Sequence, residues 1–184
     1  LEDAVRSDAA SVVSDLHALG IERVAMLTGD NADTAKFVAA TVGIDDVRSE
    51  LLPEDKVKAV EELAAEASPL AMVGDGVNDA PAMARADIGI AMGAAGSDAA
   101  IEAADIALMS DDLSRIPWLI RHARRALRII RQNIVFSLVV KAAFVVLTFS
   151  GYASLWAAIA ADMGASLLVI GNGLRLLLNR LGRT

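Results

Sequence analysis

Apolar positions in the first part of the chain, residues 1–112, predict alternating strands and helices. Short apolar runs, which are typical of buried strands, stand at 23–27, 70–73, 88–92 and 105–108. Helical spacing of apolar residues and helix-start signals predict helices at 4–19, 34–42, 53–67 and 96–103. Strands that alternate with helices over this length predict an α/β fold with a doubly wound parallel sheet.

From residue 113 the pattern changes to long apolar runs with arginines at their margins. It predicts a basic connecting helix at 113–132, transmembrane helices at 133–150 and 155–178, and a tail at 179–184. Each apolar run, counted with its flanks, approaches the roughly 20 residues that a helix needs to cross a bilayer. The alternative is a soluble helical hairpin that is buried in a large core.

The arginines also predict how these two helices are oriented. They precede the first apolar run and end the second, so we expect both outer ends to be cytoplasmic and the short turn between the helices to lie outside. The chain would then be part of a multi-pass protein of the plasma membrane, with the lipid bilayer as a partner and a cytoplasmic C-terminus.

Composition narrows the classes of function. The net charge of −7 argues against nucleic acid as a partner. There is no cysteine, which excludes a disulfide, a thiolate metal site or a cysteine nucleophile within these residues. The chain begins at Leu1 rather than at methionine, which predicts a fragment of a longer protein.

The stretch Gly74-Asp75-Gly76-Val77-Asn78-Asp79 carries the clearest chemical signal. It follows the apolar run at 70–73 and precedes a helix start, so it lies at the carboxyl end of a predicted strand, where α/β sheets bind ligands. Gly74 and Gly76 would let the backbone approach a ligand, because glycine carries no Cβ. Carboxylate and carboxamide oxygens at this position favour Mg²⁺, which proteins usually share with a phosphate.

Two further groups suit the same chemistry. Thr28, Gly29 and Asp30 follow the predicted strand at 23–27, and Lys56 lies in the first turn of a predicted helix. The Thr28 hydroxyl and the Gly29 N–H can hold phosphate oxygens, and Lys56 can place a positive charge beside them. Phosphoryl transfer needs donors, a cation and metal ligands of this kind.

Together these stretches resemble the second, third and fourth motifs of the haloacid-dehalogenase-like phosphorylation domain of P-type ATPases. The segment 1–6 is similar to the one that re-enters this domain after the nucleotide-binding domain. The resemblance implies that Asp75 ligates Mg²⁺ with Asp79 nearby, that Thr28 and Lys56 contact an aspartyl-phosphate, and that Asn78 and Asp79 support the site. Residues 1–112 would form the C-terminal portion of that domain.

One departure from the family pattern concerns activity. The phosphorylated aspartate of the family lies in an Asp-Lys-Thr-Gly-Thr sequence, and these residues contain none. The family's nucleotide-binding and actuator domains are not represented either. We therefore expect this stretch to be inactive alone, with ATP bound mainly by a domain outside it and with the rest of the same polypeptide as its partner.

Lys141 and Asp162 are ionisable residues within the apolar runs, where such groups are costly and usually functional. Lys141 lies ten residues before Gly151, and Asp162 lies eight after Ser154. At 1.5 Å per residue their depths differ by about 3 Å, so we expect them to pair near the middle of the membrane. The alternative for Lys141 is that its side chain reaches the lipid headgroups.

Within the P-type ATPases this pattern resembles the heavy-metal branch, and Lys141 with Asp162 resembles its zinc/cadmium/lead subgroup. The resemblance implies that Asp162 ligates the transported ion together with cysteines of a helix outside this chain, and that Lys141 is the counter-charge. Asn172 and Arg175 fit the Asn-x-x-Arg-Leu ending of the branch. Zn²⁺, Cd²⁺ and Pb²⁺ stay equal candidates. The alternatives are a copper or cobalt pump, a soluble Mg²⁺-dependent phosphatase of the same fold and a non-catalytic membrane protein.

Overall fold

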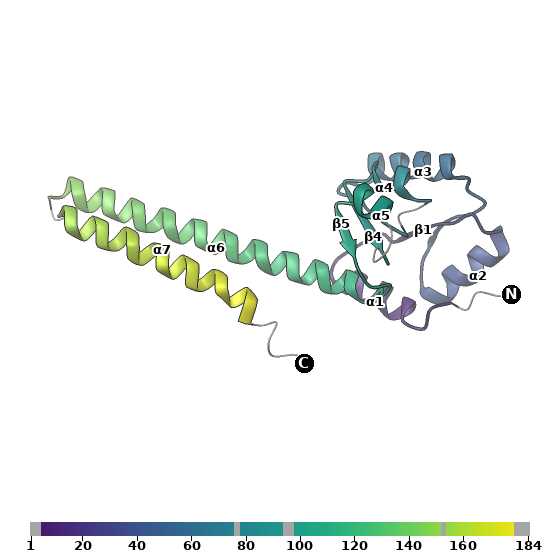
Figure 1. Cartoon of the computed structure of the whole chain (residues 1–184), viewed down its shortest axis with the longest axis horizontal. Helices are drawn as coiled ribbons and strands as arrows, with labels where there is room; N and C mark the ends of the chain where they lie inside the picture. The colour runs from purple at the N-terminus through teal and green to yellow at the C-terminus, as the bar shows by residue number, and fades with distance from the viewer. Residues whose placement is uncertain (1–4, 76–77, 94–97, 152–153, 179–184) are drawn as a thin grey trace. The chain divides into compact units, whose positions relative to one another are not determined.

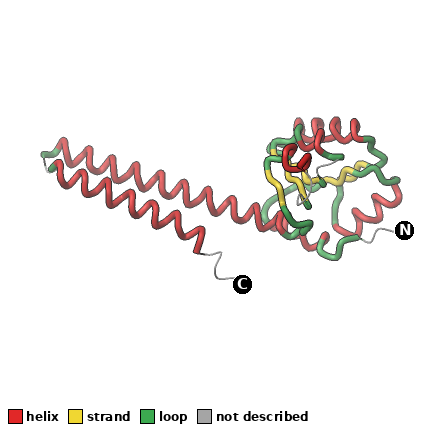
Figure 2. Tube along the Cα trace, viewed as in Figure 1, coloured by secondary structure: helices red, strands yellow, loops and turns green. Residues whose placement is uncertain are grey.

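The computed structural model describes residues 5–75, 78–93, 98–151 and 154–178. The chain divides into two compact units, residues 1–118 and 119–184, and each is described by itself. The first unit mixes helices and strands, whereas the described part of the second unit contains two long helices and the turn residues between them (Figures 1 and 2). The predicted α/β fold followed by two long apolar helices is confirmed.

The strands that the structure describes in the first unit form two parallel sheets rather than the single sheet that the sequence predicts. One sheet pairs β1 (Ala25–Leu27) with β2 (Asp46–Arg48). The other has the order β3-β4-β5, with β3 (Ala71–Gly74), β4 (Ile88–Met92) and β5 (Ile106–Leu108). Within the described sheets, β1 and β3 therefore each have one hydrogen-bonded neighbour.

Among the described residues of the first unit, five helices accompany these strands, and the residues at their ends explain where they begin and stop. In α2 the Asn31 side chain caps the first turn by accepting from Thr34 N at 2.9 Å, and Gly43 ends the helix with a φ of 81°. Pro53 opens α3 at a position where its missing N–H costs nothing. The helices are α1 (Ala9–Ala18), α2 (Ala32–Val42), α3 (Pro53–Glu66), α4 (Ala80–Met83) and α5 (Asp98–Ala103).

The core beside the second sheet is built on Met83 of α4 and Ala91 of β4. Both side chains are fully buried, and Met72 of β3 and Ala107 of β5 pack against them. This packing holds α4 over the sheet, so the loop between β3 and α4 has a fixed strand before it and a fixed helix after it.

The second unit holds most of α6 (Arg115–Phe149) and all of α7 (Leu155–Leu178). Both helices are long and apolar enough to cross a membrane. The predicted basic helix and first transmembrane helix are one continuous helix, because no glycine or proline interrupts the chain between Pro117 and Phe149. Figure 2 shows α6 and α7 as an antiparallel pair, and a hydrogen bond between the side chains of Asn172 and Asn133 confirms the contact.

Candidate functional site

Lys56 and Asp79 form a largely buried ion pair at the end of β3. The Lys56 ammonium lies 2.7 Å from Asp79 Oδ1, and the two side chains are only 19% and 16% exposed. The pair joins the first turn of α3 to the residue before α4 and so connects two of the motifs that the sequence analysis places in one site. Limited exposure to water makes such a charge pair stronger than one at the surface.

Gly74 makes room for this pair. A Cβ at residue 74 would lie 2.8 Å from both the Asp79 Cβ and Asp79 Oδ2, closer than carbon and oxygen atoms can approach. The chain therefore folds back so that the Asp79 side chain covers the end of its own strand. The sequence predicts Gly74 as a point of ligand approach, and the structure gives it a second role as a seat for Asp79.

Thr28 and Asp30 form a tight turn at the end of β1. The Thr28 hydroxyl donates to Asp30 Oδ2 at 2.8 Å and accepts from Asp30 N at 3.1 Å. Backbone hydrogen bonds then tie this turn to the next segment: Leu51 N donates to Thr28 O at 3.1 Å, and Glu50 N donates to Asp30 O at 2.8 Å. Because Pro53 starts α3 only two residues after Leu51, the turn is linked through α3 to Lys56.

Glu50 belongs to this linkage and has no sequence signal that marks it. Its φ is 57°, a left-handed conformation that residues other than glycine rarely adopt. A strained backbone position of this kind persists only when the surrounding structure holds it in place. Here the bond from Glu50 N to Asp30 O provides one such restraint.

The other residues that the sequence predicts for the site are not part of the Lys56–Asp79 pair or of the Thr28–Asp30 side-chain contact. Asp75 and Asn78 are exposed, whereas Gly76 lies outside the described residues. A Cβ on Gly29 would meet Leu51 O at 3.4 Å, at the edge of ordinary contact. In the part of the chain that the structure describes, no three acidic or histidine side chains gather as a metal cluster.

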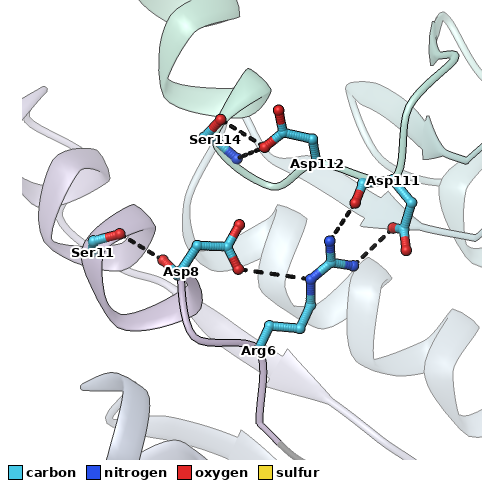
Figure 3. Close-up of polar contacts among 6 residues, drawn as sticks. All are labelled: Arg6, Asp8, Ser11, Asp111, Asp112 and Ser114. Carbon is cyan, nitrogen blue, oxygen red and sulfur yellow. Dashed lines mark hydrogen bonds and ion pairs between the residues drawn. The ribbon is translucent and has the colours of Figure 1, made fainter.

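A second polar cluster joins the N-terminal segment to the loop after β5 (Figure 3). Arg6 Nη1 pairs with Asp111 Oδ1 at 2.8 Å, and Arg6 Nη2 donates to the Asp111 carbonyl. This hydrogen bond to the carboxylate raises the pKa of Arg6 above its usual value. Next to it, the Ser114 hydroxyl donates to Asp112 at 2.6 Å and lowers the pKa of that carboxyl. No pattern in the sequence marks Arg6 or Asp111 as partners.

Asn133 of α6 and Asn172 of α7 make the polar contact between the two long helices. Asn172 Nδ2 donates to Asn133 Oδ1 at 2.8 Å, and Asn133 Nδ2 donates to Val169 O at 3.4 Å. Arg175 Nη1 adds a bond to Asn172 Oδ1 at 3.3 Å. Side-chain hydrogen bonds across apolar helices hold them in one register. A sequence pattern marks Asn172 and Arg175, whereas none marks Asn133.

The expected pair between Lys141 and Asp162 is not observed: both side chains are exposed, and the ion pairs among described residues include none between them. Their positions on the helices nevertheless agree. Lys141 follows Asn133 by eight residues, and Asp162 precedes Asn172 by ten. At 3.6 residues per turn each lies about 80° around its helix from the asparagine contact. Because the helices are antiparallel, both rotations lead to the same side of the pair.

Comparisons with known proteins cover nearly the whole chain. A model of the haloacid dehalogenase-like hydrolases matches residues 1–87. A probable cadmium-transporting ATPase of Listeria monocytogenes is 52% identical over 95% of this chain and 25% of its own length. A cadmium, zinc and cobalt-transporting ATPase of Bacillus subtilis is 51% identical over 96% of this chain and 26% of its own length. A crystal structure of a zinc-transporting PIB-type ATPase in the E2.Pi state matches with a TM-score of 0.87 at 50% identity, over 95% of this chain and 28% of that one.

The chain belongs to the heavy-metal-transporting P-type ATPases. It spans about a quarter of the length of the relatives it matches. The resemblance that the sequence motifs predict is thereby confirmed. In this P-type ATPase chain, the Thr28 turn, Lys56 and Asp79 are connected through α3, while Asn133 and Asn172 connect the two helices that are long enough to span a membrane.

Proposed function

We propose that the chain forms part of a pump that exports Zn²⁺, Cd²⁺ or Pb²⁺ across the plasma membrane, driven by ATP through an aspartyl-phosphate intermediate. The observation that carries the proposal is the Lys56–Asp79 pair at the end of β3, which lies in the same chain as two candidate membrane spans. Similarity to relatives that are named as cadmium or zinc transporters favours this ion class. The two apolar helices count against the alternative of a soluble phosphatase.

Each side chain of the site around Thr28, Lys56 and Asp79 has a role in this proposal. The pair with Asp79 holds the Lys56 ammonium at the strand end, where it can face a phosphoryl group. The Thr28 hydroxyl would turn the hydrogen that it donates to Asp30 Oδ2 toward a phosphate oxygen, while Asp30 N keeps donating to the hydroxyl oxygen. Asn78 and the backbone of Gly29, Gly74 and Gly76 would complete the wall of the site. Positioning of this kind provides most of the catalysis in phosphoryl transfer.

The loop after β3 also fits Mg²⁺. This ion binds proteins through one or two carboxylates and takes its other ligands from phosphate and water. Asp75 is an exposed carboxylate at the strand end, and Asp79 lies nearby in the same loop. Asp75 would hold the ion, with Asp79 oriented by Lys56. When bound, Mg²⁺ would neutralise the charge that develops on the transferred phosphoryl group.

The open sides of β1 and β3 favour a further strand from the rest of the polypeptide. Each is the end strand of its parallel sheet, and an unpaired strand edge offers N–H and C=O groups to an added strand. The Asp-Lys-Thr-Gly-Thr segment of the family is the expected occupant. Its aspartate would then lie at the carboxyl ends of the strands, beside Asp75 and Thr28. ATP would be bound mainly by the nucleotide-binding domain outside this chain.

The position of the transported ion is proposed from the long helices. Asp162 is the only acidic residue in the two apolar runs of the sequence. By helix geometry, Lys141 lies within about 3 Å of the depth of Asp162 along the helix axis and on the same side of the helix pair. Carboxylate oxygen is an accepted ligand for Zn²⁺ beside thiolates. Asp162 would therefore ligate the ion, and Lys141 would compete with it for the carboxylate and so favour release.

Substitution of Asp162 in the complete transporter tests the transport site. Asp162→Ala should abolish Zn²⁺-stimulated ATP hydrolysis and lower the amount of bound metal, while the protein still reaches the membrane. Lys141→Ala should keep the bound metal but change turnover. Ser166→Ala, one turn further along α7, is the matched control and should behave as wild type. Wild-type metal stoichiometry and turnover in Asp162→Ala would refute the assignment.

Substitution of Asp75 tests the soluble site separately. Asp75→Asn keeps the shape of the side chain but removes its charge, so phosphoenzyme formation from ATP should collapse, with partial recovery at high Mg²⁺. Asp33→Asn removes one charge from an exposed position in α2 and should have no such effect. Phosphorylation of Asp75→Asn at the wild-type rate at ordinary Mg²⁺ would show that the loop is not the metal site.

A further inference from the structure

We propose that one face of α6 binds the headgroups of anionic lipids. This arginine face consists of Arg121, Arg124, Arg125, Arg128 and Arg131, all of which are exposed. The proposal rests on the membrane location in the proposed function and adds a specific lipid chemistry, a negatively charged phosphate headgroup.

The five arginines occupy a narrow part of the helix surface. At 3.6 residues per turn they fall within about 120° of arc. Asn133, which contacts α7, lies at least about 80° away from every one of them. The arginine face is therefore directed away from α7, and Ile129, close to Asn133 in angle, is buried instead.

The segment that carries the arginine face contains basic residues but no acidic ones. Between Asp112 and Asp162 the sequence contains neither aspartate nor glutamate. The arginine face thus concentrates positive charge on a chain whose net charge is −7. A cluster of four to eight basic residues next to a membrane span is the arrangement that attracts anionic lipids.

The length of α6 places this charge at the membrane surface. Its 35 residues extend about 52 Å, whereas the hydrocarbon core of a bilayer is about 30 Å thick. If the last 20 or so residues cross that core, the crossing starts near Ile130. Arg128 and Arg131 then stand at its boundary, and Arg121 lies about 14 Å beyond it. All five guanidinium groups are within reach of the headgroup layer, because arginine side chains extend along the helix.

Apolar side chains beside the arginine face fit the same location. Leu127 and Ile130 are 65% and 52% exposed, and they continue the apolar surface of the span toward the arginines. A helix with a basic face and an adjoining apolar face is typical of the boundary between headgroups and acyl chains. An acidic surface on another domain of the same polypeptide would attract the arginines but would not require these exposed apolar neighbours.

The test compares lipids bound to the complete transporter in nanodiscs of phosphatidylcholine, with and without phosphatidylglycerol. The first variant, R121Q/R124Q/R125Q, removes three charges from outside the hydrocarbon core. The matched control, K36Q/K58Q/R85Q, removes three exposed charges from the first unit, residues 1–118. A third variant, R121K/R124K/R125K, keeps the charge. Native mass spectrometry counts the phosphatidylglycerol that stays bound, and thermal unfolding checks that each variant is folded.

Phosphatidylglycerol should be retained preferentially by the wild type, by the lysine variant and by the control with substitutions in the first unit. Added salt should weaken this preference. In R121Q/R124Q/R125Q the preference for phosphatidylglycerol should fall at least about fivefold, which is the effect of removing one basic side chain from an anionic surface. Equal retention by wild type and the glutamine variant would overturn the proposal. A second outcome would also overturn the proposal: the ATPase activity of the glutamine variant falls equally in both lipids while its retention of lipid is unchanged. That result would indicate that the arginines bind a protein partner. A transporter that retains anionic lipid but moves no metal would refute the proposed function and leave the lipid site intact.

Discussion

At Gly74 the hydrogen in place of a side chain lets the loop after β3 fold back onto its own strand. Gly74→Ala should therefore push Asp79 outward and lengthen its contact with Lys56, since the added methyl group would lie 2.8 Å from two Asp79 atoms. We expect a loss of about 1–3 kcal/mol in the free energy of unfolding, the usual cost of overpacking, together with loss of phosphoenzyme formation. Chemical denaturation of the purified transporter measures the first quantity.

Gly29→Ala is the control for this substitution. Its methyl group would lie 3.4 Å from Leu51 O, so its effect on stability should be clearly smaller. Equal losses for the two variants would mean that the Asp79 contact is not what requires glycine at residue 74. The comparison isolates a contact that the sequence does not reveal, because the sequence predicts glycines at a strand end but does not specify which side chain will cover them.

Arg6 holds the segment before α1 against the loop after β5 through an exposed, two-point contact with Asp111. Arg6→Gln removes both bonds, so residues 5–8 should exchange their amide hydrogens faster while the unfolding of the whole unit changes little. Hydrogen-exchange mass spectrometry measures this local effect. Lys36→Gln removes the same charge from α2, where the described residues include no ion pair to Lys36, and should leave exchange at 5–8 unchanged. Unchanged exchange in Arg6→Gln as well would contradict the role of the contact.

At the level of helices, the asparagine contact between α6 and α7 should fix their register. Asn133→Ala and Asn172→Ala should each destabilise the helix pair by about 0.6 kcal/mol, and at most about 2 kcal/mol, the range for interhelical hydrogen bonds in membranes. The double variant should cost less than the sum of the two, because both substitutions remove the same bond. Unfolding in bicelles measures all three.

Thr148→Val is the matched control for the asparagine contact. The Thr148 hydroxyl donates to Phe144 O of its own helix at 2.8 Å, so its loss should not couple to either asparagine. Strictly additive losses for Asn133→Ala and Asn172→Ala would show that the bond between them does not contribute.

The sequence predicts some of these elements more accurately than others. It predicts β4 and α7 with the bounds that the structure has, because an apolar run with clear ends defines each. It misses β2, whose Asp46 and Arg48 are charged and which is a strand because it pairs with β1. It divides α6 at residue 132, where composition changes from basic to apolar although nothing interrupts the helix. Composition indicates what surrounds a helix, but hydrogen bonding decides where the helix ends.

For the whole chain, motif order predicts that Lys56 and Asp79 lie together, whereas strand periodicity does not predict that the strands form two sheets. The sequence places Thr28, Lys56 and Asp79 in one site, and the structure links them through α3. It predicts one sheet, whereas β1 and β3 belong to two. We attribute the separation to the strand that we propose to lie between them, which no pattern within these residues could supply.

We propose the orientation of the two long helices from their charges, and it can be tested on this chain directly, because the chain contains no cysteine. Arginine-rich ends stay in the cytoplasm, so residue 14 of α1 and residue 184 should lie on the cytoplasmic side and residue 154 on the other. Single-cysteine variants Ser14→Cys, Ser154→Cys and Thr184→Cys in sealed vesicles, treated with a membrane-impermeant maleimide, report each side. In right-side-out vesicles only Ser154→Cys should react, and permeabilisation should expose the other two. Reaction of all three from one side would mean that α6 and α7 do not both cross the bilayer, and the level that Lys141 and Asp162 share would then have no bearing on transport.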